Sequence, residues 1–175
     1  ALTAVHFGDH STREVRLAIQ FALEFVEDRS AAPAPQVRPH LDHVQGLAGG
    51  VDAILAVERI LEDDNDDAWL VANRARLAAG SPLSAHLVWR MLERHRHVGL
   101  AEALRNELSL SVQCGRSGDV REGVRALLVD KDRAPRWQHE CVASVPEADI
   151  LALMAPLWSE ESHPLRDLGT VKCLD

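Results

Sequence analysis

The stretch Asp119-Val-Arg-Glu-Gly-Val-Arg-Ala-Leu-Leu-Val-Asp-Lys-Asp-Arg-Ala-Pro-Arg-Trp137 joins an amphipathic helix to a charged turn. Asp119 followed by Glu122 is typical of a capping box at a helix start. Apolar residues then recur at helical spacing and predict one buried face: Val120, Val124, Leu127 and Leu128. Pro135 cannot continue a helix, so we expect the four charges from Asp130 to Arg133 to crowd a helix C-terminal corner ahead of Trp137.

On both sides of this run, hydrophobic periodicity predicts further helices, and no stretch alternates strand and helix. Helices are expected at residues 12–28, 40–47 and 51–62. A further helix is expected to start in the acidic run 62–67 and to end near Ala79, and others are expected to begin at Ser81, at Leu100 and at about Pro146. Two inner faces are expected, one with Leu83, Leu87, Val88, Met91 and Leu92, and one with Leu100, Leu104, Leu108 and Val112. High aliphatic content without Tyr favours helix over sheet, so the predicted fold class is all-α.

The composition excludes several classes of function. The chain has 175 residues and a formal net charge of -8, which argues against a nucleic-acid partner and against an anionic membrane surface. No apolar run approaches the roughly 20 residues that cross a bilayer, and Ala1-Leu2-Thr3 does not read as a signal peptide. Cys114, Cys141 and Cys173 have no metal-ligand spacing, which suits reduced thiols and predicts a cytoplasmic location.

The run resembles a C-terminal pattern, "EGVRA-L-DKD--P-W", of the 3-hydroxyisobutyryl-CoA hydrolase branch of the crotonase (enoyl-CoA hydratase/isomerase) superfamily. Other segments of this chain are similar to that branch in the same order: His40 with Val44, Gly50-Val-Asp-Ala-Ile-Leu55, Gly80-Ser-Pro-Leu-Ser84 and Leu100-Ala-Glu-Ala-Leu-Arg-Asn-Glu107. The resemblance covers about residues 38 to 150. It implies four segments along the chain. Residues 1–29 form a helix resembling the end of a crotonase core, and residues 30–39 are a Pro/Ala linker. Residues 40–158 form a helical C-terminal domain, and residues 159–175 are a tail.

In that family, the oxyanion hole for the thioester carbonyl and the catalytic carboxylates belong to an N-terminal α/β core. No such core is visible in this sequence, so no catalytic residue and no tightly bound cofactor is predicted. The resemblance implies a chain that covers an acyl-CoA pocket beside a crotonase-like core, whether from the same gene or from a separate chain. Self-association is the other partnership expected. The alternative is a free-standing helical interaction module that has kept the fold without acyl-CoA chemistry. An exposed apolar face on the first helices, around Phe21, would favour a missing core or partner.

Lys131 and Arg133 are the candidate binding residues. The resemblance implies that basic residues near this corner approach the nucleotide end of the coenzyme A moiety, and both cations suit phosphate. The structural alternative, which the neighbouring carboxylates favour, is that they cap the helix C-terminus and pair with Asp130 and Asp132. Three residues of the run are expected to be structural: Glu122 as cap, Arg125 as ion pair and Trp137 as core anchor.

We interpret the other clusters of polar residues and glycines in the sequence as structural. His40 and His43 have helical spacing but no completing metal ligand. Asp63, Asn65 and Asp67 lack the glycine and the closing glutamate of a calcium loop, so they predict a solvated helix start. Gly49-Gly50 predicts a C-cap and turn, while His95-Arg-His97 and His139-Glu-Cys141 are expected to be surface clusters.

Overall fold

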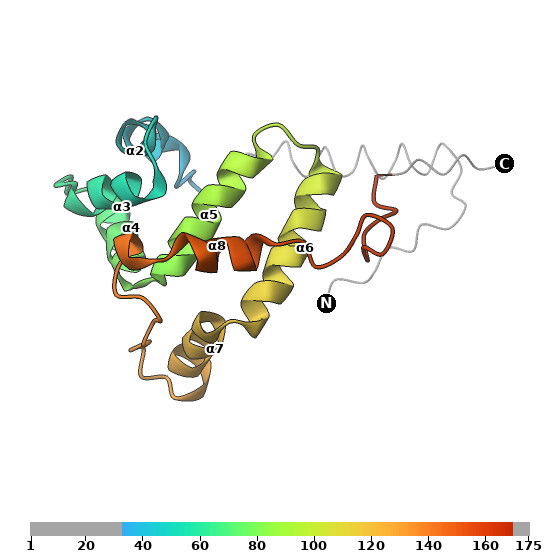
Figure 1. Ribbon diagram of the computed structural model, residues 1–175. Helices are drawn as coiled ribbons and strands as arrows, with labels where there is room; N and C mark the ends of the chain where they lie inside the picture. The colour runs from blue at the N-terminus through green and yellow to red at the C-terminus, as the bar shows by residue number, and fades with distance from the viewer. Residues whose placement is uncertain (1–32, 170–175) are drawn as a thin grey trace. The chain divides into compact units, whose positions relative to one another are not determined.

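The computed structural model describes residues 33–169, and every regular element in that range is helical (Figure 1). The predicted all-α class is therefore confirmed for this part of the chain. The α-helices are α2 (Leu41–Ala48), α3 (Ala53–Glu62), α4 (Ala68–Ala79), α5 (Pro82–His95), α6 (Leu100–Arg116), α7 (Gly118–Val124) and α8 (Glu147–Met154). Two 3-10 turns, η1 (Arg38–His40) and η3 (Val142–Ser144), and a π-helical turn, η2 (Arg125–Val129), complete the set.

The chain divides between Pro39 and His40 into two units, and the elements from α2 onward belong to the second. The predicted helix at 12–28, with Phe21, lies outside the described residues. The four segments inferred from the sequence, and the three boundaries between them, stay predictions. Among the residues that the structure describes, no helix combines the length and the apolar character that crossing a membrane requires.

Helix α5 begins as its sequence predicts. The Ser81 side chain accepts a hydrogen bond from the Ser84 N–H at 3.1 Å, and Pro82 occupies the first turn, where its missing N–H costs nothing. Leu83, Leu87 and Met91 are buried. The predicted inner face was too broad, however, because Val88 and Leu92 are 61% and 64% exposed. Each directly follows a buried residue in the helix, Val88 after Leu87 and Leu92 after Met91, so its side chain points away from the core.

The core of the second unit lies where α5, α6 and α8 meet. Its buried members are Leu83, Leu87, Val145 and Ile150, and the half-buried side chains packed around them are Leu110, Cys114, Leu153 and Met154. Helix α8 packs against both α5 and α6, and Figure 1 shows it between them.

The predicted inner stripe of α6 was wrong at its start. Leu100 is 77% exposed and Leu104 is 39% exposed. Helix α6 instead presents Leu110 and Cys114 to the core. Helical spacing identifies a candidate apolar stripe, but a neighbouring helix decides which side of α6 is covered. Burial also raises the pKa of the Cys114 thiol, since the thiolate would be poorly solvated there.

The acidic run between α3 and α4 is a connection and not a helix start over its whole length. Helix α3 ends at Glu62, and α4 begins only at Ala68. Asp67 alone caps α4, because its carboxylate accepts from the N–H groups of Trp69 at 2.8 Å and Leu70 at 3.1 Å. The predicted end of this helix near Ala79 is confirmed, but its start in the acidic run was predicted too early.

The pair Gly49-Gly50 ends α2, as predicted. The Gly49 N–H donates to the Gln45 carbonyl at 2.7 Å, and Gly50 has a φ of 72°, in the left-handed region that glycine tolerates. A Cβ on residue 49 would lie 2.6 Å from the Gln45 carbonyl oxygen, whereas a Cβ on Gly46 would meet nothing within 4 Å.

We therefore expect Gly49→Ala to lower the thermal unfolding midpoint, because the turn after α2 must shift to relieve this overlap. The matched control is Gly46→Ala inside α2, which should raise stability by about 0.5–1 kcal/mol because alanine is the better helix former. Differential scanning calorimetry of the two variants measures both effects. Equal midpoints would contradict the close approach at residue 49.

Candidate functional site

The run from Asp119 to Trp137 forms α7, the π-helical turn η2 and an extended return segment. The expected capping box is absent: α7 is capped by Ser117, without a side-chain bond, and Asp119 is buried at 4% exposure. Its carboxylate accepts from the Ser81 hydroxyl at 2.6 Å and from the Gln138 N–H at 3.0 Å. Asp119 therefore ties the start of α5 to the end of the run, which sequence spacing alone did not reveal.

Arg125 is the centre of the charged corner. Its guanidinium donates two hydrogen bonds to Glu122, at 2.7 and 2.9 Å, and one each to Asp130 at 2.6 Å and Asp132 at 2.7 Å. It also reaches the Ala134 carbonyl at 3.2 Å. The predicted internal ion pair of Arg125 is confirmed, and it extends to three carboxylates. One planar guanidinium can do this because its donors point in several directions.

Glu122 has a different role from the predicted cap. Besides its pair with Arg125, it accepts a hydrogen bond from the Arg136 N–H at 2.7 Å, which holds the return segment. The Arg125 guanidinium, followed by that N–H, lowers the pKa of Glu122 to about 2. The same guanidinium, helped by the Ala134 N–H, lowers the pKa of Asp132. Glu122 in turn is the largest cause that raises the pKa of Arg125, so Glu122, Asp132 and Arg125 stay ionised near neutral pH.

Lys131 and Arg133 lie at the tip of this corner, and both are exposed. Their expected pairing with Asp130 and Asp132 was wrong, because Arg125 binds both carboxylates. Within residues 33–169, no ion pair involves the side chain of either candidate. Both residues have positive φ, 57° and 54°, which holds the tip in an uncommon backbone conformation.

Trp137 anchors the end of the run at the junction of α4 and α5. Its ring N–H donates to the Ala79 carbonyl at 3.0 Å, and the side chain is half-buried, outside the core cluster. The ring lies over Gly123, where a Cβ would be 3.3 Å from it. Glycine at 123 therefore lets the indole sit close to α7.

The run carries five large apolar side chains that the described part of the chain leaves exposed. We call this set the α7–η2 apolar face. The exposed fraction of the side chain rises along this set from 41% to 68%, and the members in that order are Val120, Val124, Leu127, Leu128 and Val129. The prediction that the first four form a buried face was therefore wrong for this chain taken by itself.

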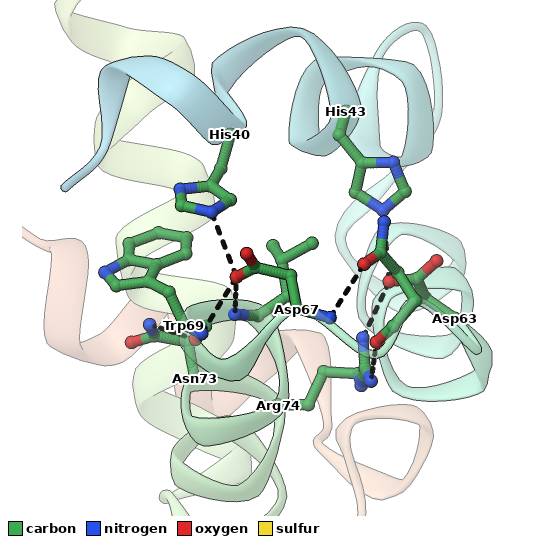
Figure 2. Close-up of polar contacts among 9 residues, drawn as sticks. His40, His43, Asp63, Asp67, Trp69, Asn73 and Arg74 are labelled. Atoms are coloured by element: carbon green, nitrogen blue, oxygen red, sulfur yellow. Dashed lines mark hydrogen bonds and ion pairs between the residues drawn. The ribbon is translucent and has the colours of Figure 1, made fainter.

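A second polar cluster fastens α2 to the connection between α3 and α4, and Figure 2 shows its geometry. The His40 ring nitrogen lies 3.0 Å from Asp67, and the imidazole stacks on Trp69 with ring centres 4.5 Å apart. His43 pairs separately with Asp63 at 3.1 Å, and that carboxylate also accepts from Arg74 at 2.7 Å. These contacts, with His43 first among the causes, lower the pKa of Asp63.

This cluster is structural, since each histidine is bound to a different carboxylate. The Asp63 side chain is only 9% exposed, so the expected solvated helix start was wrong at this residue. Within residues 33–169, no three His, Cys, Asp or Glu side chains are arranged to hold a metal ion.

In each of the two expected surface clusters one histidine is half-buried, and the other two residues are exposed as predicted. His95 has an 18% exposed side chain and approaches Glu107 of α6 at 4.0 Å. His139 is 15% exposed and contacts Asp149 of α8 at 3.2 Å. Cys141 is exposed, and both it and Cys114 are free thiols.

Comparison with known proteins places this arrangement in a family. The sequence matches the model of the enoyl-CoA hydratase/isomerase family over residues 2–154. The chain therefore belongs to the enoyl-CoA hydratase/isomerase family, as the resemblance of the run implies. Within that family, its relatives lie in the 3-hydroxyisobutyryl-CoA hydrolase branch.

Three curated relatives show the extent of the similarity. The 3-hydroxyisobutyryl-CoA hydrolase of Danio rerio, named as mitochondrial, is 37% identical over 100 residues, covering 57% of this chain and 25% of that protein. The Xenopus laevis protein of the same name is 31% identical and covers 70% of this chain and 31% of its own length. The 3-hydroxyisobutyryl-CoA hydrolase-like protein 1 of Arabidopsis thaliana is 34% identical over 66% of this chain and 30% of its own length. The chain thus spans between a quarter and a third of these relatives.

A solved structure gives the same result at the level of fold. The crystal structure of an enoyl-CoA hydratase from Rhodobacter sphaeroides superposes with a TM-score of 0.62 at 26% sequence identity. The match covers 84% of this chain and 44% of that one. This chain therefore shares its fold with part of that enoyl-CoA hydratase.

Proposed function

We propose that this chain forms the helical C-terminal part of an acyl-CoA-processing enzyme, similar to 3-hydroxyisobutyryl-CoA hydrolase or enoyl-CoA hydratase. In this role it covers the acyl-CoA pocket and leaves the chemistry to the α/β core of the family. The core comes from the same gene or from a separate chain. The fraction of its relatives that this chain spans, from 25% to 31%, supports a partial role.

The observation that carries the proposal is the exposed α7–η2 apolar face. Leu127, Leu128 and Val129 are each more than 60% exposed although they follow one another in the most family-like run of the chain. A run of exposed large apolar side chains favours a contact with another protein surface. We infer that the catalytic core is its occupant, since that is the part of the relatives that this chain does not span.

Lys131 and Arg133 are proposed to contact phosphate groups of the coenzyme A moiety. Arg125 neutralises Asp130 and Asp132, so these carboxylates offset the positive field of the two exposed cations less than the sequence suggests. The three-carboxylate corner also fixes the loop that carries both residues. A cytoplasmic location stays a prediction.

The main test is catalysis by the isolated chain. We expect no hydrolysis of 3-hydroxyisobutyryl-CoA, because positioned oxyanion donors and a catalytic acid or base are the task of the core. Release of free thiol from purified protein measures this. Turnover that persists through repeated purification and copurifies with the chain would refute the non-catalytic role.

A second test addresses the phosphate contact in the assembled enzyme. Lys131→Ala/Arg133→Ala should weaken coenzyme A binding about three- to tenfold, the effect expected for two exposed cations. Arg59→Ala/Arg116→Ala removes the same charge from exposed positions on α3 and α6 and serves as the control. Unchanged affinity in the Lys131 and Arg133 variant, measured by calorimetry, would remove these residues from the site.

The alternative is a free-standing interaction module, and one observation favours it. Leu83, Leu87, Val145 and Ile150 form a buried core without any other chain. The two functions differ in what the α7–η2 apolar face binds. Leu127→Asp/Leu128→Asp should abolish association with the catalytic core under our proposal, and it should leave a self-sufficient module unaffected.

A further inference from the structure

A separate polar cavity of about 650 Å³ lies between the C-terminal end of α5, the first half of α6 and the segment that follows α8. Figure 1 shows this last segment running past α6. The volume lies in the range of about 300–1,000 Å³ that is usual for small-molecule sites. We call it the α6 cavity, and it contains neither Lys131 nor Arg133.

Three guanidinium groups from three different segments line the α6 cavity. They belong to Arg94 of α5, Arg105 of α6 and Arg166 of the segment after α8. Arg94 has no ion pair among the residues described by the structure. One terminal nitrogen of Arg105 donates to the carbonyls of Leu165 and Leu168, and its other side-chain donors have no partner in residues 33–169.

A buried donor in the same wall also lacks a partner. The side-chain nitrogen of Asn106 is buried and makes no hydrogen bond within the described part of the chain. A buried polar group without a partner costs free energy, and it commonly marks the place of an ordered water, an ion or a ligand. Here the adjacent groups are cationic, so an acceptor with negative charge fits best.

The cavity wall is fixed before any ligand arrives. His163 is 6% exposed, and its Nδ1 accepts from the Leu165 N–H at 3.0 Å. Its other nitrogen therefore carries the proton and donates to the Arg105 carbonyl at 3.2 Å. Trp158 packs against the same ring at 5.1 Å. Both ring nitrogens of His163 are occupied, so the histidine holds the wall and leaves the guanidinium groups to bind.

Two carboxylates, Glu102 and Glu160, also line the α6 cavity. Arg166 also lies 3.9 Å from Asp167, whereas Arg94 and Arg105 have no ion pair within residues 33–169. We propose that the α6 cavity binds a small-molecule oxyanion, a phosphate or a carboxylate group, through Arg94, Arg105 and Arg166. Guanidinium groups match both kinds of oxyanion because their paired N–H groups face two oxygens at once. The proposal is independent of the acyl-CoA role.

Titration calorimetry of the full chain with inorganic pyrophosphate and with citrate, at ionic strength matched with chloride, tests this. We expect saturable binding of at least one of the two anions, and the comparison distinguishes phosphate from carboxylate. Arg94→Gln/Arg166→Gln should weaken that binding about tenfold, because it removes two of the three cations. The variant should still fold, since neither side chain donates to a backbone carbonyl in the described residues. Arg59→Gln/Arg116→Gln removes equal charge elsewhere and should change affinity less than about twofold.

A gain-of-function variant keeps the proposal testable if the arginine variant fails to fold. Glu102→Gln/Glu160→Gln removes like-charge repulsion and should tighten anion binding about threefold. No saturable binding of either anion would overturn the proposal. So would equal affinities in the Arg94/Arg166 and Arg59/Arg116 variants, or no tightening on loss of both carboxylates.

Discussion

Ile150→Ala is expected to destabilise the helical unit by about 2–5 kcal/mol, the range for removing a large aliphatic side chain from a packed core. Ile150 is 1% exposed and contributes to the cluster that joins α5, α6 and α8. The deleted methyl and methylene groups leave a cavity that surrounding helices fill only in part. Urea unfolding followed by circular dichroism measures the effect as a lower midpoint at an unchanged slope.

The neighbouring residue provides the control for this variant. Leu151 is in the same helix but 59% exposed, so Leu151→Ala should change stability by less than about 0.5 kcal/mol. Similar losses in the two variants would mean that α8 does not pack through Ile150.

Arg125→Met should lower the thermal midpoint by about 5 °C or more, because it breaks the hydrogen bonds that one guanidinium makes with three carboxylates. Glu122, Asp130 and Asp132 would then face each other without a counter-ion. Arg121→Met, on an exposed position of α7, removes the same charge without touching the corner and should have little effect.

The same variant should alter the response to acid. Glu122 titrates near pH 4.5 when unfolded and near pH 2 when folded, so its stabilisation is present above pH 4.5 and is lost as the pH falls towards 2. Asp132, whose pKa is also lowered, acts in the same direction. In Arg125→Met this acid-dependent loss should shrink, since the carboxyl groups return towards their ordinary pKa. An unchanged pH profile of the midpoint would contradict the arrangement.

Local signals in the sequence were sufficient to predict several features. Ser81 followed by Pro82 defines the start of α5, and Gly49-Gly50 defines the end of α2, because caps and turns depend on residues that are close in sequence. Family resemblance was also readable, since it rests on the order of short motifs. The all-α class followed from helical spacing alone.

Contacts over long sequence distances were not predictable. Asp119 looked like a helix cap, but its partners Ser81 and Gln138 are 38 and 19 residues away. The pattern of Val120 and Leu127 correctly indicated an amphipathic helix without showing whether its cover lies in this chain. At the corner, four neighbouring charges suggested mutual pairing, yet Arg125 from the preceding turn binds both acids and leaves Lys131 and Arg133 exposed. In the α6 cavity, no spacing relates Arg94 to Arg166.

The position of α8 along the chain has a consequence for biosynthesis. Translation proceeds from the N-terminus at roughly 5–20 residues per second, so α5 and α6 are made before the helix that packs against both. Until Ile150 has emerged from the ribosome, Leu83 and Leu87 lack the side chain that closes their cluster. We therefore expect the nascent helices to need protection from aggregation during that interval, and a premature stop codon before residue 150 should yield a product that is degraded.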